Sequence, residues 1–339
     1  MMFNMLSPAL ATSYFDEANE YTNVTHRLPF AEQKCKDGTT IRKYSKHNSN
    51  VSYEHTKELL CDLGMQKPFI DSLSQESLTR YAQAESIISI VTYTKTDANG
   101  NVEVVDEQTA MNSVTTYSIG DDKINQQIGG FEGAGADVTQ EYFQDSYMRI
   151  CLTIVYIANG KYHFSVDATW LNEPFFRGWD SIGISATHIS IHNSSRSGWF
   201  QYDSYIQLTS LGESYISEDT VTLPFSDTIQ NRITGNWNGS GATFKLPNDS
   251  YYSDHLSTQI LNLSNFKAHF EFDATIDTPD QTVVFNVTAA YDHSTITLIS
   301  EPSLSIGLDG VNAIILDISR GNETRIVELD SPITYVPKN

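Results

Sequence analysis

The sequence predicts a mainly β protein, in which a small α-helical hairpin and a β-hairpin precede an antiparallel β-sandwich region of one or two sandwiches. From about residue 142 onward, short runs rich in β-branched and aromatic residues are separated by Gly, Asn, Asp and Pro. Many of these runs alternate polar and apolar residues, as antiparallel sheets with one wet face do. Only residues 53–85 space their apolar residues as a helix does.

These patterns divide the chain into six segments. The predicted strands cover 149–157, 162–169, 181–191, 198–208, 242–246, 266–276, 282–290, 295–300, 313–318 and 324–329. The segments are 1–11, a signal-peptide remnant; 12–51, an extended polar arm; 52–119, a small α+β segment; 120–139, a Gly-rich linker; and 140–235 and 236–339, two sandwich halves or domains.

The N-terminal elements follow from local signals. Residues 9–11 read Ala-Leu-Ala, a pattern that signal peptidases accept, although no positively charged region precedes it. Leu59, Leu60 and Leu63 recur at helical spacing, and Gly64 stands where a helix C-cap is expected. A short helical turn is predicted at residues 69–73, and a further helical face at Leu78, Tyr81 and Ala82, so the sequence predicts a helical hairpin whose apolar face needs a partner.

A β-hairpin is predicted next, because two β-branched runs flank a turn rich in Asn, Asp and Gly. Asp97, Asn99 and Asn101 also resemble the start of a calcium loop. Gln108 stands where such a loop needs a glutamate ligand. The hairpin turn is therefore the preferred interpretation, structural calcium is the alternative, and no other cofactor is expected.

Two heptapeptides resemble each other. Residues 163–169 and 269–275 share His, Phe, Asp, Ala and Thr in register, 106 positions apart. This separation is the length of a β-sandwich and favours a duplication, whereas a chance match is the alternative.

No local catalytic signature is present: the sequence contains no GxSxG, HExxH or CxxC motif. His188 and His192 would lie roughly 13 Å apart on one strand, too far for a shared zinc ion. Glu271 and Asp273 stand on one strand face with His269 and would suit a carboxylate pair, but a solvated sheet face is the preferred interpretation. An enzyme is therefore the less favoured class.

Aromatic residues mark the candidate binding face. All four tryptophans fall within residues 170–237, several beside Asn, Asp and Gly, as sugar-binding surfaces require. The alternative, favoured for at least two of the four, is that the rings fill the ends of the sandwich core. The candidate ligand-binding residues are Trp170, Trp179, Trp199, Tyr202 and Trp237.

Three cysteines are too few for a disulfide scaffold. Cys35 and Cys61 are close enough in sequence to form a disulfide in an exported chain, and Cys151 lies in an apolar run that predicts a core thiol. Three reduced thiols are the alternative.

The net charge of the chain limits the classes of binding partner that we expect. The 42 acidic and 21 basic residues give a net charge of −21, which disfavours nucleic acid and anionic membranes, and no run of about 18 apolar residues predicts a membrane-spanning helix. We expect a secreted or cell-surface, non-catalytic binding or surface-interaction protein, with carbohydrate as the preferred ligand and a cell-surface protein as another. The alternatives are a secreted hydrolase that acts on glycans through unplaced carboxylates, and a β-rich toxin or self-assembling surface subunit. The sequence leaves the oligomeric state open.

Overall fold

The fold is taken from a computed structural model, and it is mainly β with antiparallel sheets, as predicted. The structure describes residues 30–46, 52–97, 101–112, 146–172, 177–210, 213–228, 231–236, 238–253, 257–294, 303–305, 315–317, 322–328 and 332–337. The predicted signal-peptide remnant, residues 1–11, and the predicted Gly-rich linker, residues 120–139, lie outside this range.

The predicted polar arm is partly ordered into strands. Strand β1 (Phe30–Lys34) and strand β2 (Thr40–Ser45) form a hairpin, and β2 pairs with strand β3 (Ser86–Thr96). The sequence of this hairpin has no clear alternation of polar and apolar residues, so it does not predict strands. The hairpin is half-exposed at the edge of the sheet and therefore needs few apolar residues. The extended arm expected for residues 12–51 is therefore wrong for residues 30–45.

Three helices follow and confirm the helical hairpin, with a short extra turn between its arms. They are α1 (Tyr53–Asp62), α2 (Lys67–Ser72) and α3 (Gln75–Gln83). Ser52 and Ser74 cap α1 and α3 by accepting a backbone N–H bond. Leu59, Leu60 and Phe69 bury the apolar faces of the helices against the main sheet. No helix within the described ranges is long and apolar enough to cross a bilayer.

The predicted β-hairpin is confirmed: β3 pairs with strand β4 (Val102–Val105), and helix α4 (Glu107–Asn112) comes next. The Asp97 carboxylate accepts hydrogen bonds from the backbone and the side chain of Asn101, so it closes the turn itself.

The main sheet has eleven strands and runs β1-β2-β3-β5-β6-β15-β9-β10, with the remaining three strands paired at its margins. The further strands are β5 (Ser146–Ala158), β6 (Lys161–Asn172), β8 (Ile189–Ile191), β9 (Ser197–Ser210), β10 (Glu213–Pro224), β14 (Ser250–Ser253) and β15 (Ser257–Ile276). The short helix η3 (Asn193–Ser195) precedes β9.

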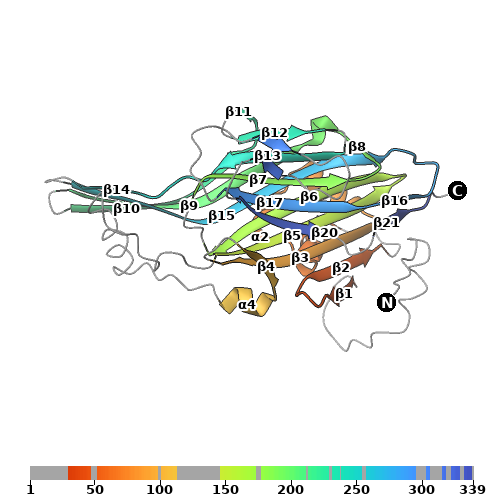
Figure 1. Cartoon of the computed structure of the whole chain (residues 1–339), viewed down its shortest axis with the longest axis horizontal. Coiled ribbons are helices and arrows are strands. Elements are labelled where there is room, and N and C mark those ends of the chain that lie inside the picture. The colour runs from red at the N-terminus through yellow and green to blue at the C-terminus, as the bar shows by residue number, and fades with distance from the viewer. Residues whose placement is uncertain are drawn as a thin grey trace.

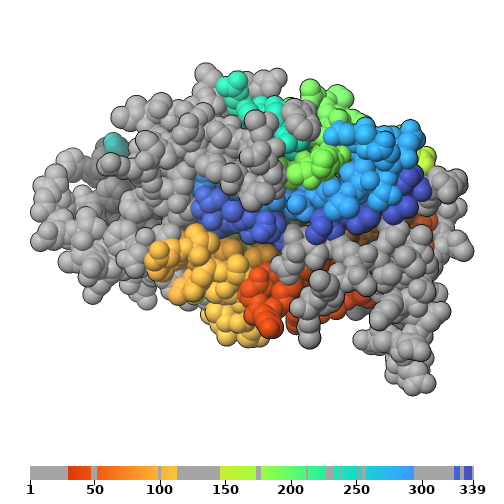
Figure 2. All heavy atoms as spheres, turned by 45° about the vertical axis from the view of Figure 1, so that its right-hand side comes forward, coloured from red at the N-terminus to blue at the C-terminus, as the bar shows by residue number. Residues whose placement is uncertain are grey.

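A second sheet of six strands runs β11-β12-β13-β7-β17-β20. Its strands are β7 (Trp179–Ala186), β11 (Asp227–Thr228), β12 (Asn231–Gly235), β13 (Gly239–Lys245), β17 (Val287–Ser294) and β20 (Asn322–Glu328). Two further pairs are β16 (Val283–Phe285) with β21 (Ile333–Tyr335), and β18 (Ser303–Ser305) with β19 (Ile315–Asp317). In Figure 2 the blue C-terminal strands lie beside the orange segment of β4 and α4.

The two larger sheets form the predicted sandwich around one core. Leu152 and Phe164 of the main sheet share this core with Ile184 and Phe244 of the second sheet. Because β7 pairs with both β13 and β17, strands from either side of residue 235 build the same sheet. The two regions 140–235 and 236–339 are thus interleaved parts of one sandwich rather than successive domains.

The predicted strand 181–191 is two strands in different sheets. Strand β7 belongs to the second sheet and β8 pairs with β15 in the main sheet. The chain turns between them at His188, which has a φ of 56°. His188 and His192 therefore do not share a strand, and among the described residues no group of three or more His, Cys, Asp or Glu is placed to hold a metal ion.

One end of the main sheet projects from the body. Figure 1 shows β9, β10, β14 and β15 extending well beyond the second sheet and the helices. Strands β10 and β14 and the first half of β15 were not among the predicted strands, because β10 and β15 are rich here in Ser, Thr, Asn, Asp and Glu and β14 has only four residues.

Candidate functional site

The two similar heptapeptides pair with each other. Residues 163–169 lie on β6 and residues 269–275 on β15, and the strands are antiparallel neighbours. In this register His269 lies opposite Asp167, Asp273 lies opposite His163, and Glu271 lies opposite Ser165. Directly opposite residues point to the same face of a sheet, so five ionisable side chains gather on one face.

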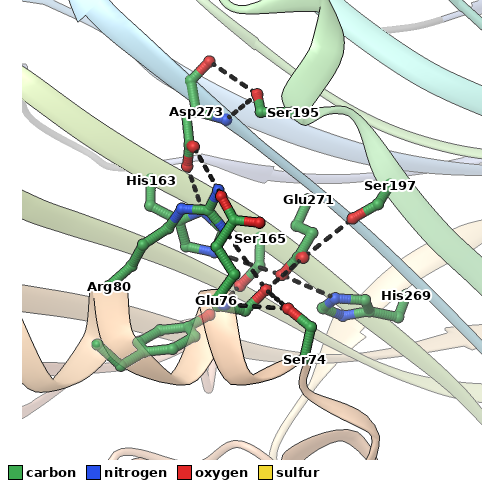
Figure 3. A network of polar contacts seen from close by, with 12 residues as sticks. Ser74, Glu76, Arg80, His163, Ser165, Ser195, Ser197, His269, Glu271 and Asp273 are labelled. Carbon is green, nitrogen blue, oxygen red and sulfur yellow. Dashed lines mark hydrogen bonds and ion pairs between the residues drawn. The ribbon is translucent and has the colours of Figure 1, made fainter.

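These five side chains form a continuous series of contacts, the histidine–carboxylate network, of which Figure 3 shows His163, His269, Glu271 and Asp273. Nδ1 of His163 lies 2.8 Å from Oδ1 of Asp273, and Nδ1 of His269 lies 2.6 Å from Oδ1 of Asp167. Oε2 of Glu271 lies between the two rings, 3.4 Å from Nε2 of His163 and 3.3 Å from Nε2 of His269. Within this network of five side chains, carboxylates and imidazoles alternate.

Helix α3 closes over the network. The Ser77 hydroxyl donates a 2.7 Å hydrogen bond to Oε1 of Glu271, and Nη2 of Arg80 lies 2.7 Å from Oδ2 of Asp273. The Tyr81 hydroxyl lies 2.8 Å from the Ser165 hydroxyl. From β9, Ser197 donates a second hydrogen bond to the same Glu271 oxygen. The helices are thus fastened to the sheet by polar contacts in addition to their apolar faces.

Opposite charges within the network shift the pKa values of its members. Burial alone would lower the pKa of His269, but hydrogen bonds to Asp167 and Glu271 outweigh it and raise the pKa to about 10. The pKa of His163 is raised as well: burial opposes the shift, and Asp273 and Glu271 outweigh it. Burial would raise the pKa of Glu271, yet the two imidazoles hold it well below the usual value. His269 is therefore a cation at neutral pH, and it faces ionised Glu271.

The row His269, Glu271 and Asp273 is covered, so the solvated face predicted for it is wrong. His269 is 4% and Glu271 6% exposed. Both oxygens of Glu271 are already engaged by serines and imidazoles, which leaves Glu271 no oxygen to attack or protonate a glycoside. The arrangement suits a clamp that joins α3, β6, β9 and β15.

The predicted ligand-binding aromatics do not gather on one face. Trp170 and Trp179 are 4% and 6% exposed, in line with the core-filling alternative. Trp199 is half-buried and stacks on Phe69 at 5.3 Å and on His269 at 5.8 Å. Tyr202 is half-buried against the rings of Phe200 and Phe266, and Trp237 lies outside the described residues.

The cysteines are placed apart. Cys151 is buried on β5 beside the Ser89 hydroxyl, which confirms the predicted core thiol. Cys61 is exposed on α1, Cys35 is half-buried near the turn between β1 and β2, and no disulfide joins the two.

A second candidate site lies on the projecting end of the main sheet. Tyr215 lies opposite Leu208, Leu208 opposite Gln259, and Gln259 opposite Tyr252, so these residues form one row across four adjacent strands. Tyr215 is 62%, Tyr252 58% and Leu208 39% exposed. We call this row the projecting tip. Sequence reasoning missed it, although each aromatic residue stands within a few positions of a hairpin turn.

Comparisons with known proteins identify no family for this chain and only distant structural similarities. No family model and no curated protein matches the chain. Among solved structures, the δ-toxin of Clostridium perfringens is 8% identical, with a TM-score of 0.25, over 89% of this chain and 99% of that one. The membrane-inserted form of the Clostridium perfringens NetB toxin is 8% identical, with a TM-score of 0.16, over 59% and 90% of the two chains. A structure titled pore forming protein is 9% identical, with a TM-score of 0.18, over 56% and 84%. TM-scores this low carry no argument about function.

Proposed function

We propose that this protein is an exported surface-interaction protein that attaches to lipid membranes through its projecting tip. The observation that carries the proposal is the row of Tyr215, Leu208 and Tyr252, three large side chains held in solvent at the end of a sheet that extends beyond the body (Figure 1).

The side chains of the tip suit a membrane interface. Tyrosine places an apolar ring at the acyl boundary and its hydroxyl among the head groups, and leucine adds apolar area. Ile216, on the opposite face of β10, is 54% exposed, so apolar groups stand on both sides of the sheet end. Clustered exposed apolar residues on a soluble chain mark an interaction surface.

The acidic residues beside the tip determine which lipid head groups the tip can approach. Glu213, Glu218 and Asp219 are exposed on β10 beside the tip, and the chain as a whole carries −21. Anionic head groups would be repelled, so the preferred surface is zwitterionic or uncharged. Membrane attachment is the first property that the β-rich toxin hypothesis requires.

Liposome flotation tests the proposal. The full chain should float with phosphatidylcholine vesicles and bind less to vesicles rich in phosphatidylserine. The double variant Tyr215→Ser, Tyr252→Ser should bind about tenfold less or weaker still, because two rings no longer enter the interface. Tyr53→Ser, which removes a tyrosine that is 43% exposed on α1, is the matched control and should bind as the parent chain does.

Two outcomes would contradict the proposal: no flotation with phosphatidylcholine, or equal flotation of the double variant. Release of a trapped dye then separates simple attachment from the membrane damage that a toxin causes.

Carbohydrate binding is the second candidate, and the tip again supports it better than the tryptophans do. Two exposed tyrosine rings with the Gln259 amide in the same row provide flat apolar surfaces and a polar group for hydroxyls. A glycan array tests this function. A saturable hit that Tyr252→Ser abolishes would favour it, and an array without hits would remove it.

A further inference from the structure

Two arginines from different strands meet at one glycine. Arg42 of β2 and Arg149 of β5 both approach Gly64, the residue that follows the C-cap of α1. A methyl group built on Gly64 would lie 2.6 Å from Nη1 of Arg42 and 3.6 Å from Nη2 of Arg149. The two guanidinium groups thus flank the same point, beside the C-terminal end of the helix.

Arg149 is deeply buried, and its hydrogen-bonding capacity is only partly used. The residue is 5% exposed, and its Nη2 donates to the Gly64 carbonyl, which fastens the end of α1 to the sheet. Its Nη1 is buried without a hydrogen-bond partner in the described part of the chain. Capping the helix accounts for Nη2, and the guanidinium also interacts with the Tyr93 side chain, while Nη1 keeps unused hydrogen-bonding capacity.

Gly64 is required by this arrangement. Its φ of 104° lies in the left-handed region, and a side chain would also collide with Arg42 and with Cγ2 of Val91. The site exists because the residue between the guanidinium groups has no side chain.

Each nearby carboxylate is engaged at one oxygen by another side chain, and Oδ2 of Asp167 has no hydrogen-bond partner among the described residues. Oε2 of Glu32 lies 2.7 Å from Nε of Arg42, which leaves Nη1 of that guanidinium beside Gly64. Glu107 accepts a hydrogen bond from the Tyr93 hydroxyl, and Oδ1 of Asp167 is held by His269. Arg42 is paired with Glu32 and partly exposed, whereas Arg149 is buried, so an anion beside Arg149 would offset the cost of burying its charge.

We propose that Arg42 and Arg149 form a binding site for a phosphate-class oxyanion, either free phosphate or a phosphate ester. Guanidinium forks match the oxygens of phosphate, and two forks from adjoining elements hold it on two sides. The Arg42 side chain is 19% exposed, so the site has a route to solvent, whereas Arg149 forms its closed end. The site lies on the body of the protein and is independent of the projecting tip.

Thermal unfolding of the full chain tests the site. Inorganic phosphate, titrated against sodium chloride of the same ionic strength, should raise the Tm along a saturable curve, because a ligand that binds only the folded state stabilises it. The same titration with glycerol 1-phosphate tells a site for free phosphate from one that also takes an ester. Arg42→Gln should abolish the phosphate-specific rise, whereas Lys245→Gln, which removes the same charge from an exposed position on β13, should keep it.

Arg42→Gln is the principal variant because its partly exposed side chain makes misfolding a smaller risk than at Arg149. Arg149→Lys, which keeps the charge but loses the fork, should weaken the phosphate response at least tenfold in apparent Kd if the variant folds. A rise equal to that in chloride, or a rise that Arg42→Gln retains, overturns the proposal.

Discussion

Strand β15 passes through two different surroundings. Its first half, up to Ser264, pairs with β9 and β14 in the projecting end, and its second half, from Lys267, pairs with β6 and β9 beneath the helices. A β-bulge separates the halves, and Asn265 within it has a φ of 56°. In the first half polar side chains face solvent, whereas in the second half His269 and Glu271 are almost completely buried.

The comparison shows that polar and apolar alternation identifies a strand but not what covers its polar face. A polar face in solvent needs no partner, whereas a covered one must satisfy every charge within the protein. The alternating charges of the histidine–carboxylate network meet that requirement except at Oδ2 of Asp167, which has no hydrogen-bond partner among the described residues. The two halves should therefore respond very differently to the loss of a single polar group.

The largest expected effect is at the centre of the network. Glu271→Ala leaves two imidazoles without their shared carboxylate in a buried site and should lower the free energy of unfolding by about 3 kcal/mol or more. Glu218→Ala, at an exposed position on β10, should change it by less than about 0.5 kcal/mol. Urea unfolding followed by tryptophan fluorescence measures both, and equal effects of the two variants would contradict the comparison.

The pH dependence of stability sharpens the same point. Since His269 has a folded pKa of about 10 against an ordinary value of 6.5, its contribution is complete below about pH 6.5 and is lost as the pH rises toward 10. Glu271, with its lowered pKa, contributes above about pH 4.5 and loses this contribution as the pH falls further. The urea midpoint of the parent chain should exceed that of His269→Asn by much more at pH 6 than at pH 9.5. A difference that is constant between those pH values would exclude the charged network.

A smaller effect is expected where the helices meet the network. Tyr81→Phe removes the hydroxyl that contacts Ser165 and should cost about 1 kcal/mol. Tyr53→Phe removes a solvent-exposed hydroxyl of α1 that contacts Thr79 of α3, and serves as the control for an exposed contact, with an expected change near zero. Hydrogen exchange of α3 amides provides a local measurement, since faster exchange in Tyr81→Phe alone would show that this contact holds the helix down.

The smallest effect on stability is expected at the projecting tip. Tyr215→Ser should change the free energy of unfolding by less than about 0.5 kcal/mol, because the ring is 62% exposed and contributes little to the core. Calorimetry checks this value. A loss of more than about 2 kcal/mol would mean that the tip is part of the folded core rather than a surface held out for a partner.

Much of the fold could be predicted from the sequence, because the core strands and the amphipathic helices leave clear patterns. Runs such as 149–157 and 162–169 are strands, and the turn at Asp97 joins a hairpin as expected. The sequence does not show which face of the sheet α1 to α3 cover, and this decides whether Glu271 is solvated or buried. The sequence therefore identified residues of the histidine–carboxylate network as one row on a strand, but it did not predict that they form a buried site.

The projecting tip could not be predicted for a different reason. Strand β10 carries Ser, Thr, Glu and Asp at most positions, so its strand propensity is weak and its pairing with β9 supplies the order. The row of Tyr215 and Tyr252 also depends on registers between strands that are distant in sequence.

The antiparallel pairing of residues 163–169 with 269–275 restricts how this sequence can drift. Each histidine pairs with an aspartate of the other segment. Losing His269 leaves Asp167 buried without its partner, whereas Asp273 keeps its ion pair with Arg80 when His163 is lost. Substitutions at His269 and Asp167 are therefore expected to occur as compensating pairs. Glu271 contacts both histidines. Substitutions at the five positions should therefore be correlated in evolution, although 106 residues separate the two segments in the chain.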